Sequence, residues 1–334
     1  MNPRRKFPAG PADPEAGSLG RLLREAARAA LPRRAWAALI GRRNAWRLAV
    51  AHGTPDIARR WGVPVFLDAA FQPRWVLDRG SAAHRIFLTT IPKAGTHMVA
   101  KMLPRLGVAN CGVHVTRDAV VDQRFAPMGA VRLYPRELAR RIPLADSVAL
   151  IGPGQFAFGH IGHDGDVTRG LFADFKVILM VRNLRDAWAS LRRYFRERRD
   201  MPGWQSPEAW FPEWKEFFAW DMAEDGPYQL IGYRKVAAWR GEPNVLCLRY
   251  EELVGDNGRD AQLQALDRLQ QFLGVRHKRE ALEDVLNTVV GQPTATKMPT
   301  RTVAAEWWSD DVERLYRRIG FAELNRELGY EEPV

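Results

Sequence analysis

The 334 residues are enough for one large α/β domain or two modest ones, and 46% of them are hydrophobic, with 12 Trp and 15 Phe. This composition excludes a disordered chain, because so much apolar surface has to be buried. The chain has two cysteines, and Cys247 stands inside an apolar run, which argues against a disulfide framework and fits a reducing, cytoplasmic compartment.

The net charge of +11 is concentrated near the N-terminus. Residues 1–60, here called the basic leader, hold 13 Lys and Arg but four Asp and Glu, so +9 of the charge lies there and +2 in the rest. This distribution argues against a basic stripe across the fold, and nucleic acid is not expected as a partner. Apolar stretches in the basic leader fall short of the ~20 residues of a membrane span, and no cleavable signal peptide is evident.

Residues 1–17 are rich in Pro, Gly and charge, which predicts a disordered basic tail. Residues 18–63 are predicted to form an N-terminal helical extension, in which Ser18 caps a first helix and Pro32 ends it before a second. We favour a helical cap that packs on the main domain. The alternative is peripheral contact between residues 18–60 and an anionic membrane.

The pattern changes in residues 64–334 to short apolar runs separated by helical patterns. This alternation predicts an α/β domain with a parallel sheet flanked by helices on both faces. A ligand is then expected beyond the carboxyl ends of the strands. The predicted strands are 85–91, 156–161, 176–181 and 244–250, and the predicted helices are 95–106, 185–198, a stretch opened by Ser206, and 259–272.

The first predicted strand runs directly into the segment IPKAGTH, residues 91–97, and a helix follows at once. Gly95 permits a close backbone approach, Lys93 adds a cation, and the amides of the helix N-terminus point into the turn. This arrangement predicts an anion-binding loop. The segment lacks the glycine spacing of a Walker A motif, so an ordinary nucleoside triphosphatase is disfavoured.

The sequence PKAGTHM resembles the PKSGTxW loop of the cytosolic-type sulfotransferases, with Ala94 in place of Ser and Met98 in place of Trp. The resemblance implies a P-loop-like fold. It also implies that the loop holds the 5'-phosphosulfate of 3'-phosphoadenosine-5'-phosphosulfate (PAPS). The residues that this implicates are Lys93, Ala94, Gly95, Thr96 and His97.

A second segment, KVILMVRNLRDAWASL, resembles the family's strand that ends in Arg, followed by a turn usually reading RDPRD and a Ser eight residues after the first Arg. These positions are Arg182 and Ser190 here, with Asn183 and Leu184 in place of Asp-Pro. The resemblance implies that Arg182 and Ser190 grip the 3'-phosphate, which distinguishes PAPS from ADP or ATP. An ion pair between Arg182 and Asp186 is the alternative.

Four further positions have weaker support from the resemblance. Tyr250, in LRYEEL, matches a Tyr near the adenine nucleotide, and a core role is the alternative. Lys297 and Arg301 stand where the family has an Arg-Lys-Gly segment over the 3'-phosphate, but the Lys-Gly pair is missing, and solvated loop charges are the alternative. His97 stands where Thr is usual, and its contact with phosphate, acceptor or the helix start stays open.

The segment GQFAFGHIGHDGD places two histidines at the end of a predicted strand, and an imidazole is suited to proton transfer near neutral pH. The resemblance implies a His on this strand as general base some twenty residues before the 3'-phosphate Arg, and His160 lies 22 residues before Arg182. His163, beside Asp164, is the competing candidate. A metal site is not expected, because no third ligand recurs at suitable spacing.

The resemblance implies transfer of a sulfuryl group from PAPS to a hydroxyl or amine acceptor by in-line displacement, with release of 3',5'-adenosine bisphosphate (PAP). Lys93 is expected to stabilise charge on the bridging oxygen, and Ser190 is implied to hold Lys93 away until acceptor binds. The acceptor is a small molecule, glycan or lipid, and neither its identity nor the oligomeric state is predicted. The aromatic segment 194–228 is predicted either as part of an acceptor wall or as a helix packed into the core.

Two other functions stay open. A P-loop-type nucleotide kinase needs a Walker lysine and an acidic metal ligand at a strand end, and neither is evident. A non-catalytic, membrane-associated nucleotide-binding protein would use the basic leader to reach an anionic membrane.

Overall fold

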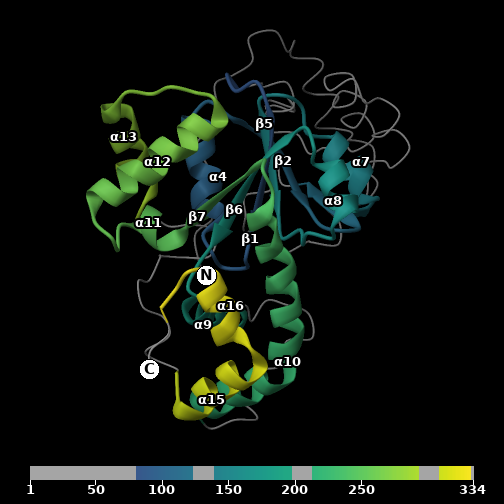
Figure 1. Ribbon diagram of the computed structural model, residues 1–334, viewed down its shortest axis with the longest axis vertical. Coiled ribbons are helices and arrows are strands. Elements are labelled where there is room, and N and C mark those ends of the chain that lie inside the picture. The colour runs from purple at the N-terminus through teal and green to yellow at the C-terminus, as the bar shows by residue number, and fades with distance from the viewer. Residues whose placement is uncertain (1–79, 123–138, 198–212, 293–307, 332–334) are drawn as a thin grey trace, which may run out of the picture. The chain divides into compact units, whose positions relative to one another are not determined.

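The computed structural model describes residues 80–122, 139–197, 213–292 and 308–331 (Figure 1). The chain divides into two compact units. The smaller includes Cys111–His114 and Asp118–Leu150, and the larger includes Arg79–Asn110, Val115–Arg117 and Ile151–Val334. The predicted disordered tail, residues 1–17, and the predicted helical extension, residues 18–63, lie outside the described residues.

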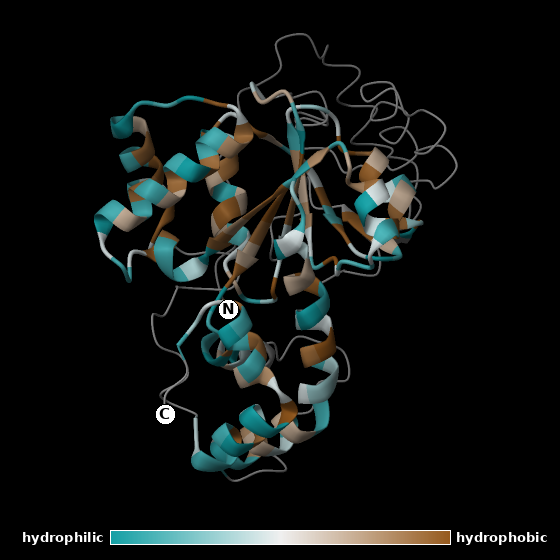
Figure 2. Cartoon of the chain, in the orientation of Figure 1, coloured by the Kyte–Doolittle hydropathy of each residue, from teal (hydrophilic) through white to brown (hydrophobic). Residues whose placement is uncertain are grey.

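A parallel sheet forms the centre of the larger unit. Its strands are β1 (Arg85–Thr90), β5 (Gln155–Gly159), β6 (Phe175–Val181) and β7 (Val245–Arg249), in the order β5-β1-β6-β7. Every neighbouring pair in this order is parallel. β1, β5 and β6 are buried along nearly their whole length, as expected for strands covered on both faces, and Figure 2 shows these strands as mostly hydrophobic. These four strands confirm the predicted ones to within one or two residues.

Helices cover both faces of this sheet, which confirms the predicted α/β fold. On one side, α4 contacts β1 and α13, and α12 contacts β7. Figure 1 shows α8 on the other side of the sheet. Phe172, directly after α8, packs against Phe87 of β1 and against Trp239, and the ring centroids are 4.9 and 5.3 Å apart. The helices of the larger unit are α4 (Thr96–Arg105), α8 (Asp166–Leu171), α9 (Leu184–Glu197), α10 (Trp214–Ala237), the 3-10 helix η2 (Ala238–Gly241), α11 (Tyr250–Val254), α12 (Arg259–Leu273), α13 (Arg279–Val289), α15 (Asp310–Ile319) and α16 (Phe321–Glu327).

The smaller unit contains an antiparallel pair that the sequence analysis did not predict. β3 (Ala119–Asp122) pairs with β4 (Ala139–Arg141), and Ala119 lies opposite Arg141. Strands this short, with Arg and Ala in the second, carry little hydrophobic pattern, which explains why they were missed. The unit also holds α7 (Leu144–Ala149) and the middle of β2 (Ala109–Val115).

The aromatic segment that was predicted as either an acceptor wall or a core helix contains α10. Phe218, Met222 and Tyr233 on this helix are fully buried, and α10 packs against α15. Its opposite side leaves Trp220 and Tyr228 exposed. The described part of this segment is therefore largely a packed helix. Among the described helices, none is long and apolar enough to cross a membrane.

Candidate active site

The loop between β1 and α4 has the geometry of an anion cradle. Lys93 has a φ of 67°, and it is the one non-glycine residue with positive φ in the described part of the chain. Gly95 caps α4 with a φ of 93°. The N–H of Ala94 donates to the carbonyl of Ile91 at 3.0 Å, so a turn already uses that amide. The N–H groups of Met98 and Val99 donate to the carbonyl of Gly95 at 3.0 and 3.1 Å, so the α4 amides that can serve a ligand begin with Thr96 and lie before Met98.

Tyr250 packs directly on this loop. It is the first residue of α11, after β7, and only 6% of it is exposed. A Cβ atom added to Gly95 would lie 2.8 Å from Cδ2 of the Tyr250 ring. The close approach explains the glycine, because a larger residue has no room there and the left-handed backbone already disfavours it.

Gly95→Ala is therefore expected to destabilise the protein by about 2–3 kcal/mol, since Ala costs about 1–2 kcal/mol at positive φ and the Tyr250 ring must also shift. The matched control is Gly274→Ala. Gly274 has a φ of 72° but nothing within 4 Å of an added Cβ, so only the backbone cost applies. Urea unfolding of both variants checks this prediction. Equal losses of stability in the two variants would show that contact with Tyr250 has no energetic effect.

Arg182 lies against the same loop from the end of β6. Its Nη1 donates to the carbonyl of Lys93 at 3.1 Å, and its guanidinium carbon lies 4.3 Å from the centroid of the Tyr250 ring. The residue is 4% exposed, and its Nε has no hydrogen-bond partner within the described part of the chain. The alternative ion pair with Asp186 is not formed among the described residues. A buried, unused N–H donor on a cation is what an anionic ligand at this position needs.

The turn after Arg182 has Asn-Leu in place of Asp-Pro and is held by a hydrogen bond to the Asn183 side chain. The Asn183 side chain accepts a hydrogen bond from the N–H of Arg185 at 3.0 Å, as an Asp would. Leu184 is fully buried. α9 begins here, and Ser190 lies on it about two turns later, half-buried.

His160 lies at the carboxyl end of β5, next to the end of β1. The parallel register pairs Thr89 with Gly159, which places His160 beside Thr90. Nδ1 of His160 lies 2.8 Å from the Thr90 carbonyl oxygen and 3.1 Å from its Oγ1. The Thr90 hydroxyl is in turn 2.6 Å from that of Thr96. A hydrogen-bonded chain therefore links the imidazole to the first residue of α4.

These contacts fix the chemical state of the imidazole. A carbonyl oxygen only accepts hydrogen bonds, so Nδ1 carries the proton and Nε2 carries the lone pair. His160 is exposed at the surface as a residue, but the protein packed around its ring lowers the pKa of His160. The Thr90 carbonyl acts in the opposite direction, and the charge of Lys93 lowers the pKa further. The neutral form with a basic Nε2 therefore dominates at neutral pH.

His163 has a different environment. Its Nε2 lies 3.1 Å from Oε1 of Glu242, and its Nδ1 accepts from the N–H of Gly165 at 3.3 Å. Its ring also packs edge-on against Trp239. Both ring nitrogens thus contact the protein, and the side chain joins the start of α8 to η2. The geometry favours His160 over His163 as the base.

Lys93 extends toward α9. Its Nζ lies 4.5 Å from the centroid of the Tyr194 ring, one helical turn beyond Ser190. His97 packs edge-on against Phe158, with ring centroids 5.7 Å apart. The two remaining candidates, Lys297 and Arg301, lie outside the described residues. No cluster of three or more His, Cys, Asp or Glu side chains that could hold a metal ion occurs in the described ranges.

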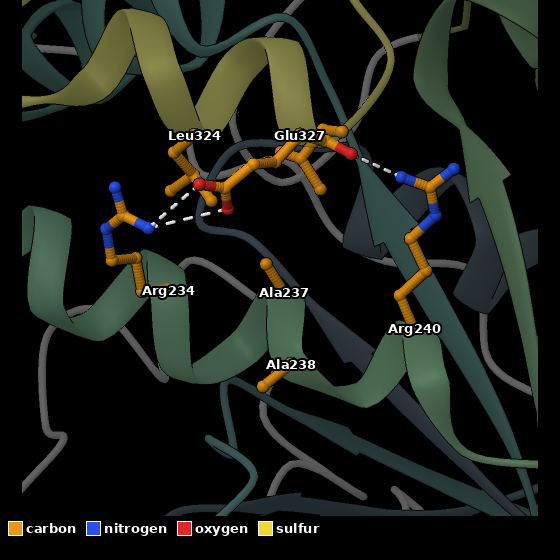
Figure 3. A pocket seen from close by; sticks show the side chains of 7 residues that line it. Arg234, Ala237, Ala238, Arg240, Leu324 and Glu327 are labelled. Carbon is orange, nitrogen blue, oxygen red and sulfur yellow. Dashed lines mark hydrogen bonds and ion pairs between the residues drawn. The ribbon is translucent and has the colours of Figure 1, made fainter.

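A separate pocket lies between α10, η2 and α16 (Figure 3). Arg234 pairs with Glu327 across it at 3.1 Å, and Arg240 donates to the Glu327 backbone carbonyl. Its cations are thus occupied by neighbouring acceptors, and it contains none of the residues singled out above. The arrangement joins helices and offers no group for chemistry.

Comparison with known proteins bears on the chemistry of this site. Residues 155–316 match the model of the sulfotransferase domain. The match covers 162 of the 334 residues and shows that this segment is similar to sulfotransferase domains. It runs from the start of β5 into α15, and it includes the candidate residues His160, Arg182, Ser190, Tyr250, Lys297 and Arg301.

Solved structures are similar to the chain at low identity. Mouse sulfotransferase SULT7A1, complexed with PAP, has 15% identity and a TM-score of 0.46, covering 75% of this chain and 90% of that one. Retinol dehydratase with androsterone and PAP has 14% identity and a TM-score of 0.47, covering 74% and 82%. Retinol dehydratase with retinol and PAP has 13% identity and a TM-score of 0.48, covering 74% and 83%. No curated protein matches significantly by sequence.

The sequence analysis missed Thr90 in the candidate site. Its hydroxyl and carbonyl both contact His160, and it is fully buried. A polar residue at the last position of a buried strand, directly before an anion-binding loop, is a signal that could have identified it. Asn183 and Glu251, which hold the turn after Arg182, were also not assigned a role.

Proposed function

We propose that the chain transfers a sulfuryl group from PAPS to a hydroxyl or amine acceptor and releases PAP. The observation that carries the proposal is the placement of Lys93, Arg182 and His160 around the carboxyl ends of three adjacent strands, β1, β6 and β5. Two cations at this edge suit a nucleotide with an anionic group at each end, and a neutral imidazole suits an acceptor that gives up a proton.

Arg182 and Ser190 would hold the 3'-phosphate. The buried Nε of Arg182 is the fitting donor, because it has no partner among the described residues and costs free energy until a ligand accepts from it. The α4 amides that begin at Thr96 would hold the 5' end, supported by the helix dipole. Tyr250 contacts both the Arg182 guanidinium and the loop at Gly95, and would limit where the nucleotide lies.

The donor supplies a sulfur atom that is electrophilic because a phosphate leaves from it. His160 Nε2 accepts the acceptor's proton as the new S–O or S–N bond forms and the bond between sulfur and the bridging oxygen breaks. Lys93 stabilises the negative charge that develops on the bridging oxygen as its bond to sulfur breaks. Thr90 holds the imidazole in the tautomer that this step needs.

The acceptor is proposed as a small molecule, glycan or lipid that carries a hydroxyl or amine. A cytoplasmic location, and a peripheral contact of residues 18–60 with an anionic membrane, stay predictions of the sequence.

The test is thermal unfolding with PAP, 5'-AMP and ADP. At 100 times its Kd, PAP should stabilise the chain by about 2.7 kcal/mol, while 5'-AMP and ADP at the same concentration should stabilise it less, since both lack the 3'-phosphate. Arg182→Ala should remove the preference for PAP. Arg268→Ala is the matched control, because Arg268 forms an exposed ion pair with Glu252 and should leave the preference unchanged. Equal stabilisation of the wild type by all three nucleotides would refute the proposal.

A further inference from the structure

The turn that carries Arg182 is held from distant parts of the chain. The N–H of Asn183 donates to Oε1 of Glu251 at 2.9 Å. The N–H of the next residue, Leu184, donates to Oδ1 of Asn325 at 2.9 Å, and Asn325 is completely buried. The two amides that follow Arg182 are therefore fixed by two side chains, one after β7 and one on α16.

Glu251 is itself held by the end of the chain. Its second carboxylate oxygen accepts a hydrogen bond from the hydroxyl of Tyr330 at 2.8 Å. The guanidinium of Arg249 lies 5.0 Å from the centroid of the Tyr330 ring and donates to the Leu328 carbonyl at 3.4 Å. Burial and the Glu251 carboxylate raise the pKa of Tyr330, so its hydroxyl keeps its proton and remains a donor.

We infer that residues 325–330, here called the C-terminal clasp, position Arg182 for the 3'-phosphate through Asn325 and through the Tyr330–Glu251–Asn183 chain. This inference rests on the proposed function. Arg182 is buried between the Lys93 carbonyl and the Tyr250 ring, so its guanidinium cannot compensate for a shift of its own backbone. A displacement of a positioned group by about 1 Å can lower a reaction rate by about two orders of magnitude.

The clasp should act on one end of the nucleotide only. Among the described residues, the hydrogen bonds of the clasp reach the turn after β6, the end of β7, α11, α10 and η2, and none of these bonds joins it to the loop of Lys93 and Gly95. Binding energy from the 3'-phosphate should therefore depend on the clasp, while binding energy from the 5' end should not.

The experiment measures the Kd values of PAP and 5'-AMP by titration calorimetry for the wild type and Tyr330→Phe. This substitution removes one hydroxyl and keeps the ring that packs on Arg249. The ratio of the Kd of 5'-AMP to the Kd of PAP should fall about three- to tenfold, because PAP binds more weakly while 5'-AMP binding is unchanged when one hydrogen bond of the clasp is lost. Tyr233→Phe is the matched control, since the buried Tyr233 hydroxyl has no partner among the described residues. It should leave the ratio unchanged.

The outcomes separate the two proposals. A wild type without preference for PAP overturns the proposed function. A wild type that prefers PAP, with an unchanged ratio in Tyr330→Phe, overturns the role of the clasp alone. Equal weakening of PAP and 5'-AMP also overturns it, since that result indicates general loosening. Non-additive effects of Tyr330→Phe and Glu251→Gln on the ratio support the chain of contacts.

Discussion

His160→Asn is expected to lower kcat by about 10²- to 10⁴-fold and to leave the Kd of PAP unchanged. Asn keeps a donor that can reach the Thr90 carbonyl, so the contact at 2.8 Å has a substitute, but no basic nitrogen remains for the acceptor's proton. Steady-state sulfation with PAPS and a phenolic acceptor measures kcat, and calorimetry measures the Kd. An active variant with normal kcat would show that His160 is not the base.

The pH profile gives an independent check of the same residue. The pKa of His160 is lowered, first by the protein around it and then by Lys93, with the Thr90 carbonyl opposing. The base is active when neutral, so kcat/KM should fall with decreasing pH only below about 6.5, the ordinary value for histidine. His163→Asn should keep both kcat and this acidic limb, because its ring nitrogens contact Glu242 and Gly165.

Arg192→Ala is expected to destabilise the protein by about 3–5 kcal/mol at pH 8, because it leaves Asp221 buried without its cation. Arg192 is 5% exposed and Asp221 is 9% exposed, and the two form an ion pair between α9 and α10. Arg192 also pairs with Asp225 at 2.6 Å and lies over the Trp188 ring at 4.1 Å. Denaturant unfolding measures the loss.

The loss should depend on pH in a defined direction. Burial raises the pKa of Asp221 to about 6, although Arg192 acts to lower it. A carboxyl whose pKa is raised in the folded state makes its full contribution to stability below its unfolded pKa near 4. This contribution is lost as the pH rises through about 6. Without Arg192 the pKa rises further, so the difference between Arg192→Ala and the wild type should grow from pH 5 to pH 8.

Two comparisons isolate the buried charge. Adding Asp221→Asn to Arg192→Ala should recover part of the lost stability and abolish its increase with pH, since no carboxylate is then buried. Arg279→Ala removes an exposed arginine that pairs with Glu283 on the surface, and its effect should be small at both pH values. A pH-independent loss in Arg192→Ala would contradict the role assigned to Asp221.

The sequence predicted the sheet of the larger unit and the loop after β1 because both leave local patterns. β1, β5, β6 and β7 are continuous apolar runs, and the loop combines a glycine, a lysine and a helix start within five residues. Parallel register then brings the ends of these strands together. Lys93, His160 and Arg182 each follow one of these strands, so the sequence pattern alone predicts that they lie at the same edge of the sheet.

The rest depends on partners that are far apart in the sequence. Leu184 and Asn325 are separated by 141 residues, and nothing local to either one indicates their hydrogen bond. His160 and His163 look alike in the sequence, because both follow the same strand. The position of Glu242, brought close by the fold, sets His163 apart from His160, the proposed base.

Tyr250 touches both Gly95 and the guanidinium of Arg182. One ring is thus shared by the two halves of the proposed nucleotide site. An attempt to change the proposed donor, PAPS, to another nucleotide by altering Arg182 would therefore also change a contact of the ring that packs on the β1 loop. Donor engineering in this chain should therefore begin from the aromatic ring and treat both loops as one unit.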